Sequence, residues 1–282
     1  MDNNTKLLGV IGSPISHTLS PKIHNFIINK LGLNYCYLPF KIEGHELSAF
    51  FESARLLNIV GFNVTIPHKE AVYGMAGEVF GDAKESKSVN TVKLDGGIFK
   101  GYSTDSQGFT LSLKERGISF SGKNVLIIGA GGAARAIVIA ACKQGAKSIN
   151  VVNRGLPHAQ KILEGLNNSS FYPLSDETLT ELAKWNDIII NCTPLGMHGF
   201  NSDFSGFGFL NTSPKTVCDL IYSPLETRFL KNARQKGHVT INGMDMLIYQ
   251  AILSLGVFTG ISLFDENKAP TKLKNDIASS LK

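Results

Sequence analysis

The sequence contains no uninterrupted apolar run that approaches the roughly 18 residues of a membrane helix. Its first residues lack the basic region and long apolar region that make a secretion signal. The net charge of +5 is not concentrated in any basic run, which disfavours nucleic-acid binding, whereas a mild positive excess suits an anionic small molecule. These absences predict a cytoplasmic protein that acts on a small molecule, without a nucleic-acid or membrane partner.

Cysteine is also scarce. The four cysteines, Cys36, Cys142, Cys192 and Cys218, are scattered, and no two form a C-x-x-C pair. They lie in or near apolar segments, so we expect buried, reduced thiols rather than a disulfide framework or a metal site. No spacing of histidine, cysteine and carboxylates suggests a metal, and the chain has no repeats.

The first part of the chain alternates short strands with helices. Apolar spacing predicts strands at residues 6–12, 34–42 and 59–67, with helices at 20–32 and 45–58 between them. This β-α-β-α-β rhythm is typical of a parallel sheet covered by helices.

The rhythm restarts after an expected helix at 103–117. The later expected elements are strands at 123–129, 148–154, 186–194, 216–222 and 238–242, a mobile glycine-rich loop at 198–209 and an apolar helix at 244–260. The 282 residues therefore predict an α/β protein of two domains. We expect a substrate domain at 1–110, onto which helices from 243–282 pack back, and a Rossmann-type NADP-binding domain at 111–242.

The strongest local motif is "VLIIGAGGAARA". Gly129, Gly131 and Gly132 stand directly after a strand and at the start of a helix, and Ala134 is small enough for the helix to pack closely. Such glycines permit a sharp turn and a close approach of the backbone to a pyrophosphate at the helix N-terminus. The alternative is a glycine turn that binds nothing.

The next strand ends in "VVNRG". An acidic residue there would hold the ribose hydroxyls of NAD, but Arg154 occupies the position. Its fork of donors suits the 2′-phosphate of NADP, although a solvated surface arginine would look the same.

The segment "GSPISHTLSPKIHN" places several hydroxyls before a helix. They cap the helix in the ordinary case and can also bind a carboxylate or phosphate.

Taken with this segment, the motifs of the whole chain resemble those of shikimate dehydrogenases, in order and spacing, from about Gly9 to Gly260. The matching motifs are "GSPISHTLSPKIHN", "GFNVTIPHKE", "SVNTV", "STDSQG", "GAGGAARA", "NCTPLGM" and "DLIYSPLETRFL".

The resemblance implies an NADP-dependent enzyme of aromatic amino-acid biosynthesis that interconverts 3-dehydroshikimate and shikimate. Lys69 matches the acid/base lysine, and Asp105 matches its partner carboxylate. A lysine ammonium can donate a proton to the oxygen on which charge develops. A structural ion pair is the alternative role for these two residues, and His17 and His68 match no catalytic position.

The resemblance also assigns binding residues. The implied substrate contacts are Thr18, Ser20, Thr65, Asn90, Gln250 and Tyr222. The implied cofactor contacts are Gly129, Ala130, Gly131, Gly132, Ala133, Asn153, Arg154, Thr193, Met197, Ile221 and Gly243. No metal is implied, and the protein is expected to be a monomer or a homodimer.

Several departures from the family pattern leave alternatives open. Thr18 replaces a serine, which could change the preference between shikimate and quinate as substrates. Gly155 and His158 remove potential contacts to a phosphate, so NAD remains possible as the cofactor. Ser103 and Asp245 also differ from the family pattern. A quinate/shikimate dehydrogenase is the nearest alternative, and a non-catalytic ligand-binding relative is the other.

Overall fold

The computed structural model describes residues 2–263 and 270–281. The chain divides into two compact units. The first unit contains the residues up to Leu111 and those from Leu247 on, and the second contains Ser112–Met246. The return to the first unit comes after Met246 rather than after residue 242, because the residues around Gly243 and Asp245 pack against the second unit.

The sheet of the first unit has the strand order β2-β1-β3-β5-β6-β4. The strands β1 (Lys6–Gly12), β2 (Tyr35–Lys41) and β3 (Gly61–Val64) are parallel, as their alternation with helices predicted. The hairpin of β5 (Thr91–Asp95) and β6 (Ile98–Tyr102) runs antiparallel to β3, and β4 (Glu78–Val79) pairs with β6. The β-α-β-α-β segment is thus parallel as expected, and the hairpin that follows it makes the whole sheet mixed.

The turn of this hairpin has a clear local cause. Gly96 and Gly97 connect paired Asp95 and Ile98, and both adopt positive φ, 57° and 80°. A two-residue turn with two positive φ values is the connection that matches the twist of a hairpin. The sequence "LDGGIF" contains this turn signal, but the apolar periodicity did not predict the two strands beside it.

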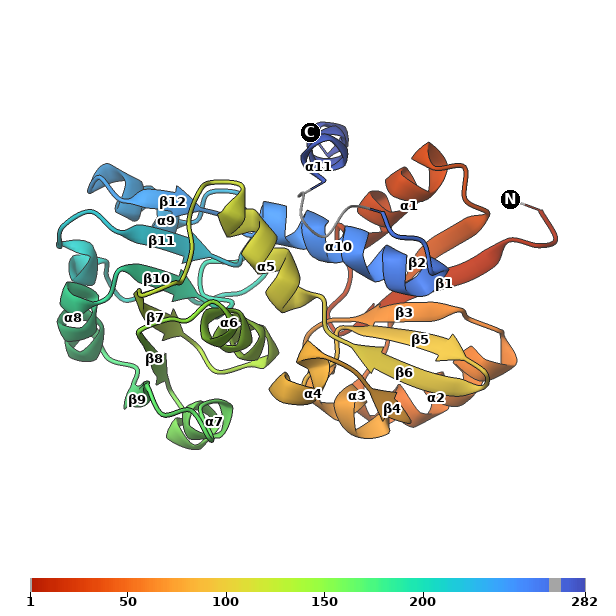
Figure 1. Cartoon of the computed structure of the whole chain (residues 1–282), viewed down its shortest axis with the longest axis horizontal. Helices are drawn as coiled ribbons and strands as arrows, with labels where there is room; N and C mark the ends of the chain where they lie inside the picture. Colours follow the sequence, from red (N-terminus) through yellow and green to blue (C-terminus); the bar gives the residue numbers. More distant parts are fainter. Residues whose placement is uncertain (1, 264–269, 282) are drawn as a thin grey trace. The chain divides into compact units, whose positions relative to one another are not determined.

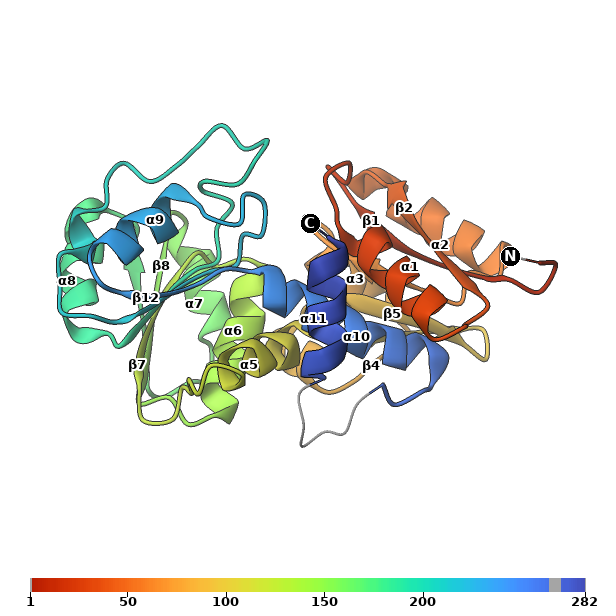
Figure 2. The same cartoon turned by 90° about the horizontal axis from the view of Figure 1, so that it is seen from above.

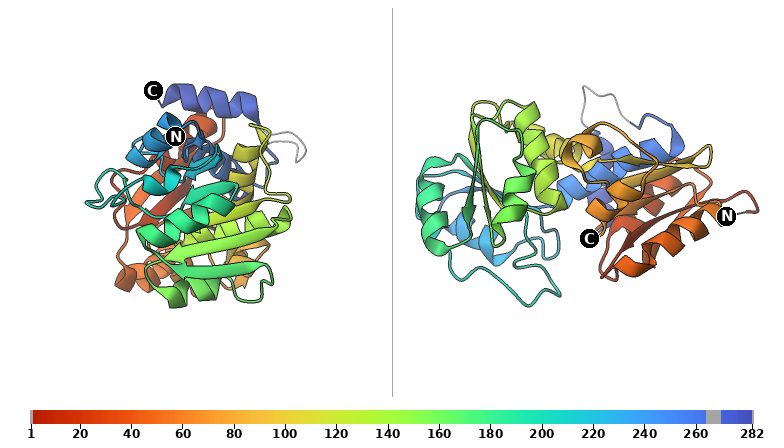
Figure 3. Two further views of the ribbon diagram at one scale, coloured as in Figure 1. Left: turned by 90° about the vertical axis from the view of Figure 1, so that its left-hand side faces the viewer. Right: turned by 90° about the horizontal axis from the view of Figure 1, so that it is seen from below.

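Helices cover both faces of the first sheet. On one face lie α2 (Leu47–Leu56), α3 (Lys69–Met75) and α4 (Asp82–Ser86), whose apolar side chains pack against the sheet around Phe62 and Phe99. The other face carries α1 (Ser20–Lys30) and α10 (Met244–Thr259), and α11 (Thr271–Ser280) packs on α1 (Figure 1; Figure 3). Short 3-10 helices are also present at η1 (Gly44–Glu46) and η2 (Gly208–Leu210).

The second unit contains a parallel sheet in the order β12-β11-β10-β7-β8-β9. Its strands are β7 (Asn124–Ile128), β8 (Ser148–Asn153), β9 (Ser169–Pro173), β10 (Ile188–Asn191), β11 (Thr216–Asp219) and β12 (Val239–Ile241). Counted within the unit, this order is that of the doubly wound dinucleotide-binding fold, whose strand order reverses between β7 and β10. Ligands of such sheets bind at the carboxyl ends of the strands beside the reversal.

Helices flank this sheet as well. The side chains of α8 (Asp176–Trp185) and α9 (Arg228–Gln235) pack on one face, and α6 (Gly132–Lys143) and α7 (Leu156–Ile162) lie on the other (Figure 2). The helix α5 (Asp105–Lys114) begins in the first unit and ends in the second. In this unit, the helices α7, α8 and α9 and the strand β9 were not foreseen from the sequence.

The glycine-rich segment 198–209 is irregular in structure, as expected. Its side chains Phe204, Phe207 and Phe209 are buried against Phe229 of α9, with ring centroids 5.2–6.5 Å from it. This aromatic cluster anchors the loop to the core of the second unit, which is an observation against free movement of the loop.

The four cysteines are free, as predicted, but only Cys218 is fully buried and the other three are partly exposed. Across residues 2–263 and 270–281, none of the helices has both the length and the apolarity needed to cross a bilayer.

Candidate functional site

One edge of the first sheet collects the predicted polar residues of the first unit. The chain leaves β3 just before Lys69, leaves β6 just before Asp105 and enters β5 just after Asn90. Because β5 runs antiparallel to β3 and β6, its beginning lies beside their ends: the N–H of Val64 donates to the carbonyl of Asn90 at 2.8 Å. Strand order therefore brings together three residues that are far apart in sequence.

Lys69 and Asp105 form an ion pair. The Lys69 Nζ donates to Asp105 Oδ2 at 2.5 Å, and only 16% and 7% of the two side chains are exposed. The Asn90 Nδ2 donates to the other oxygen, Asp105 Oδ1, at 2.8 Å. Asp105 opens α5, where the partial positive charge of the helix N-terminus favours a carboxylate. The carboxylate is thus held from three directions, and it in turn orients the ammonium.

The side-chain amide of Asn90 forms hydrogen bonds within the protein. It is 3% exposed, and its Oδ1 accepts from the N–H of Thr104 at 2.9 Å and from Thr91 Oγ1 at 2.8 Å. Its amide nitrogen has two hydrogens, and the Oγ1 of Thr104 and the carboxylate of Asp105 are its nearest acceptors. This arrangement makes Asn90 a support of Asp105. Thr104 belongs to the same hydrogen-bond network, because it bonds to both ends of the Asn90 amide. It lies beside Asp105 in "STDSQG" but was not predicted as a site residue from the sequence.

Gln250 keeps more of its hydrogen-bonding capacity. It is 8% exposed, its Nε2 donates to the carbonyl of Leu247 at 2.8 Å, and its Oε1 lies 3.4 Å from Asn90 Nδ2. A primary amide offers two donors and two acceptor positions, so within the part of the chain that the structure describes, one donor and most of the acceptor capacity remain for a ligand.

The predicted substrate contacts Thr18 and Thr65 lie on the loops that follow β1 and β3, and Ser20 is the first residue of α1. The N–H of Thr65 donates to the carbonyl of Ile11 and that of Ser13 to Ile66, so the two loops run side by side. Ser20, at the start of α1, is buried, whereas Thr18 and Thr65 are partly exposed. The N-cap residue of α1, Leu19, makes no side-chain cap hydrogen bond, and Thr18 Oγ1 accepts from the N–H of Ser20 at a long 3.3 Å.

Two histidines of these motifs, His68 and His17, are respectively structural and exposed. His68 is 2% exposed and its Nε2 lies 2.6 Å from the carbonyl of Ile42, so it braces the turn before Lys69. His17 is exposed.

The glycine loop of the second unit has the geometry that its motif predicts. Gly129 has φ +105°, and a β-carbon there would lie 2.8 Å from Thr193 Cγ2. Gly131 precedes α6, and a β-carbon there would meet no atom within 4 Å. Among the described residues no side chain caps α6, so its first N–H groups are available to an anion. The residues present therefore fit a pyrophosphate.

The end of β8 lies at the same edge of the second sheet. Arg154 is exposed there, and Asn153 Nδ2 donates to the carbonyl of Gly155 at 2.9 Å. A β-carbon at Gly155 would lie 3.3 Å from His158 Nδ1, so the histidine occupies the space beside this glycine.

The remaining predicted cofactor residues follow β10 and β11. Thr193 and Met197 lie on the loop after β10, and Ile221 follows β11. Gly243 cannot carry a side chain, because a β-carbon there would overlap the carbonyl oxygen of Leu220. Tyr222 also follows β11 and belongs to the second unit, whereas the other predicted substrate contacts belong to the first.

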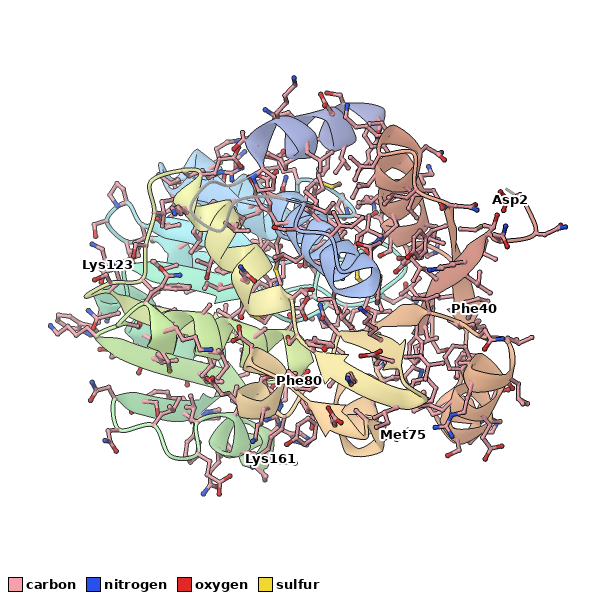
Figure 4. All side chains as sticks on the ribbon, turned by 45° about the vertical axis from the view of Figure 1, so that its right-hand side comes forward. Asp2, Phe40, Met75, Phe80, Lys123 and Lys161 are labelled. Atoms are coloured by element: carbon pink, nitrogen blue, oxygen red, sulfur yellow. The ribbon has the colours of Figure 1, made fainter. Side chains whose placement is uncertain are left out.

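A surface pocket of roughly 420 Å³ lies elsewhere in the second unit. It is lined by α7 and the beginning of β9, including Lys161 (Figure 4) and Phe171. The lining belongs to α7, the segment after it and the beginning of β9 rather than to the loops at the carboxyl ends of β7 and β10, so we do not assign this pocket to the cofactor. In the described part of the chain, no group of three or more histidine, cysteine, aspartate or glutamate residues could hold a metal ion.

Comparison with known proteins finds the same family that the sequence motifs resemble. Residues 10–92 match the family described as "Shikimate dehydrogenase substrate binding domain", and residues 111–197 match "Shikimate / quinate 5-dehydrogenase". The shikimate dehydrogenase (NADP(+)) of Carboxydothermus hydrogenoformans is 40% identical over 267 residues, which cover 93% of this chain and 94% of that protein.

Two solved structures extend the likeness to the fold. Shikimate 5-dehydrogenase from Listeria monocytogenes, in complex with shikimate and NAD, has a TM-score of 0.85 and 32% identity, with 99% of this chain and 98% of that chain covered. A shikimate dehydrogenase in complex with NADP+ has a TM-score of 0.85 and 36% identity, with 100% and 98% covered. The chain belongs to the shikimate dehydrogenase family.

Proposed function

We propose that this protein interconverts 3-dehydroshikimate and shikimate with NADP. The observation that carries the proposal is the Lys69–Asp105 ion pair, at 2.5 Å and largely buried, at the edge of the first sheet where Thr65 and Gln250 also lie. Family membership supports the reaction, and the nicotinamide supplies or accepts the hydride.

Each residue of the first unit has a chemical role in this proposal. The ammonium of Lys69 donates a proton to the oxygen of the ring ketone as it is reduced, and takes one from the hydroxyl in the reverse direction. Asp105 orients Lys69, and Asn90 together with Thr104 orients Asp105. The free donor and acceptor of Gln250 suit a ring hydroxyl, and the hydroxyls of Thr18, Ser20 and Thr65 suit the carboxylate end of the substrate.

The second unit has the cofactor role. The uncapped N-terminus of α6 and the open space in front of Gly131 receive the pyrophosphate. Arg154, exposed at the end of β8, pairs with the 2′-phosphate. Tyr222 is proposed as a substrate contact from the second unit.

The direct test compares four reactions of the purified protein: shikimate or quinate, each with NADP or NAD. Formation of the reduced nicotinamide yields kcat/KM for each pair. We expect shikimate with NADP to be preferred by an order of magnitude or more. Comparable values with quinate or NAD would instead establish the dual-specificity enzyme, and Thr18→Ser and Gly155→Thr would then be the first changes to make.

The same assay addresses the non-catalytic alternative. A ligand-binding relative would bind shikimate or NADP in calorimetry and show no turnover in any of the four reactions. That outcome would overturn the proposed activity, because pure binding needs no proton donor at position 69.

A further inference from the structure

Asp219 is a buried carboxylate that the proposed reaction does not use. It ends β11 in the second unit and is 1% exposed. Burial raises its pKa to about 6, an effect that hydrogen bonds from Thr227, Ile221 and Asn191 oppose. A buried carboxylate destabilises a fold unless its oxygens are paired, so the identity of its partners is informative.

One partner connects Asp219 to the loop after β10. Asn191 Nδ2 donates to Asp219 Oδ1 at 3.0 Å, which fixes the orientation of that amide. Its Oδ1 then accepts from both the N–H and the Oγ1 of Thr193, at 3.0 and 2.6 Å. Thr193 Oγ1 accepts in turn from the N–H of Leu195 at 3.2 Å, and the methyl group of Thr193 lies over Gly129 of the glycine loop.

The other partners connect Asp219 to the loop after β11. The N–H of Ile221 donates to Asp219 Oδ1 at 3.2 Å, and Thr227 Oγ1 donates to Asp219 Oδ2 at 2.6 Å. Thr227 is also the N-cap of α9, where it accepts from the N–H of Leu230. The carbonyl of Ile221 accepts from the N–H of Gly243 at 3.0 Å. Both ends of the 221–227 loop are therefore held by one carboxylate.

We infer that Asp219 is a positioning residue for the cofactor. Its carboxylate joins the loops after β10 and β11, and through them it sets the places of Thr193, Ile221 and Gly243 around the glycine loop. The inference rests on the proposed cofactor role of the second unit. It assigns a task to a residue that touches neither substrate nor cofactor and acts through Asn191 and Thr227.

The test measures cofactor affinity separately from turnover and stability. In Asp219→Ala, the donors of Asn191, Ile221 and Thr227 lose their acceptor, so the loops relax. We expect the Kd and KM for NADP to rise about 10-fold or more, with kcat at saturating NADP within about 3-fold of wild type. Shikimate binding without cofactor should change less than NADP binding, because Tyr222 is the one proposed substrate contact on the relaxed loops. Asp219→Asn keeps the shape and one oxygen acceptor, so it should recover part of the affinity.

A matched control separates positioning from general loosening. Asn186 is also a buried polar residue of the second unit, 1% exposed, but it lies before β10, at the opposite edge of the sheet. Asn186→Ala should lower the melting temperature and leave the Kd for NADP unchanged. If it raises the Kd as much as Asp219→Ala does, Asp219 has no specific role.

Two further outcomes are decisive. If wild type binds NADP and Asp219→Ala binds it equally well, the inference is overturned and the proposed function stands. If wild type binds no NADP, the proposed function fails and this inference fails with it. Should Asp219→Ala not fold, Thr227→Val deletes the hydroxyl that donates to Asp219 Oδ2 while keeping the side chain's shape. An unchanged KM for NADP in that variant would also overturn the inference.

Discussion

Lys69 occupies a position that helix stability does not explain. It is the first residue of α3, where the partial positive charge of a helix N-terminus disfavours a cation. The nearby carboxylate of Asp105 compensates, and the pair is kept largely away from water. A partly buried ion pair contributes little to stability on balance, which makes a chemical role the better explanation for this lysine.

Replacing Lys69 should therefore reduce the rate far more than binding. Lys69→Met keeps the length of the side chain and removes the proton donor. We expect kcat to fall by about 10²–10⁴-fold, the usual contribution of a positioned acid or base, with the Kd for shikimate within several-fold of wild type. Steady-state kinetics and calorimetry would measure the two effects. A kcat within 3-fold of wild type would remove Lys69 from the mechanism.

Arg154 should determine the choice between the two nicotinamide cofactors. Loss of a charge-assisted contact to the 2′-phosphate should lower kcat/KM for NADP by about 10–100-fold in Arg154→Ala and leave the value for NAD nearly unchanged. Lys161→Ala is the matched control, since it removes an exposed positive charge from α7 (Figure 4) at the pocket away from the carboxyl ends of the strands. Equal losses with both cofactors in Arg154→Ala would contradict the assignment.

The burial of His24 should make the stability of the fold depend on pH. It is fully buried on α1, stacked on Tyr37 with ring centroids 4.0 Å apart, and neither ring nitrogen has a hydrogen-bond partner among the described residues. Burial lowers its pKa from 6.5 to about 3. The unfolded chain therefore binds a proton between these pH values that the folded chain does not bind. The free energy of unfolding is therefore unaffected by protonation of His24 above pH 6.5, and it decreases as the pH falls from 6.5 towards 3 because this protonation favours the unfolded chain.

Replacement of His24 by phenylalanine should remove that dependence. In His24→Phe the free energy of unfolding should no longer carry this contribution, whose slope is up to about 1.4 kcal/mol per pH unit below pH 6. The variant should also be more stable at pH 7.5 by about 1 kcal/mol or more, because two unpaired polar atoms leave the core. Urea unfolding of both proteins from pH 4.5 to 8 would test this, and parallel pH curves would show the pKa of His24 to be unshifted.

At the scale of elements, the start of α10 is constrained by its contacts with the second unit. Gly243 approaches the carbonyl of Leu220 too closely for any side chain, and Asp245 in the first helical turn pairs with Arg116 at 2.6 Å. The departure from the family pattern at Asp245 thus has a structural explanation: its carboxylate is bonded to the segment that follows α5.

Gly243→Ala should be destabilising. The added methyl group would displace the backbone at Leu220, so we expect a loss of about 1–3 kcal/mol or more in the free energy of unfolding and a weaker Kd for NADP. Gly74→Ala provides the contrast, because Gly74 lies in α3 with no atom within 4 Å of the new methyl group. That change should stabilise the helix by about 0.5–1 kcal/mol. Wild-type stability in Gly243→Ala would show that the Leu220 backbone yields readily.

At the scale of the whole molecule, each unit has its own sheet and its own core. The proposed function assigns most of the substrate residues to one unit and the cofactor to the other. A ligand that binds only the folded protein stabilises it by about 2.7 kcal/mol at 100 times its Kd. We therefore expect shikimate and NADP each to raise the melting temperature when added alone. The shift with NADP should persist in Lys69→Met, and a shift with neither ligand would contradict the assignment of two binding units.

The sequence by itself determined part of the secondary structure and the chemistry of its local motifs. Apolar periodicity located β1, β2, α1, α2 and α10 because it depends on residues close together in the chain. The glycine loop before α6 was recognisable for the same reason, since its strand, turn and helix are consecutive. The motifs also sufficed to indicate the family, which the comparisons confirm.

Only the tertiary structure decided which residues meet. Asn90 reaches Asp105 because β5 is inserted antiparallel beside β3 and β6, and no local pattern specifies that neighbour. The support from Thr104, the unpaired burial of His24 and the joining of two loops by Asp219 likewise depend on strand order and packing. Such contacts link residues far apart in sequence, so they exist only once the sheets have formed.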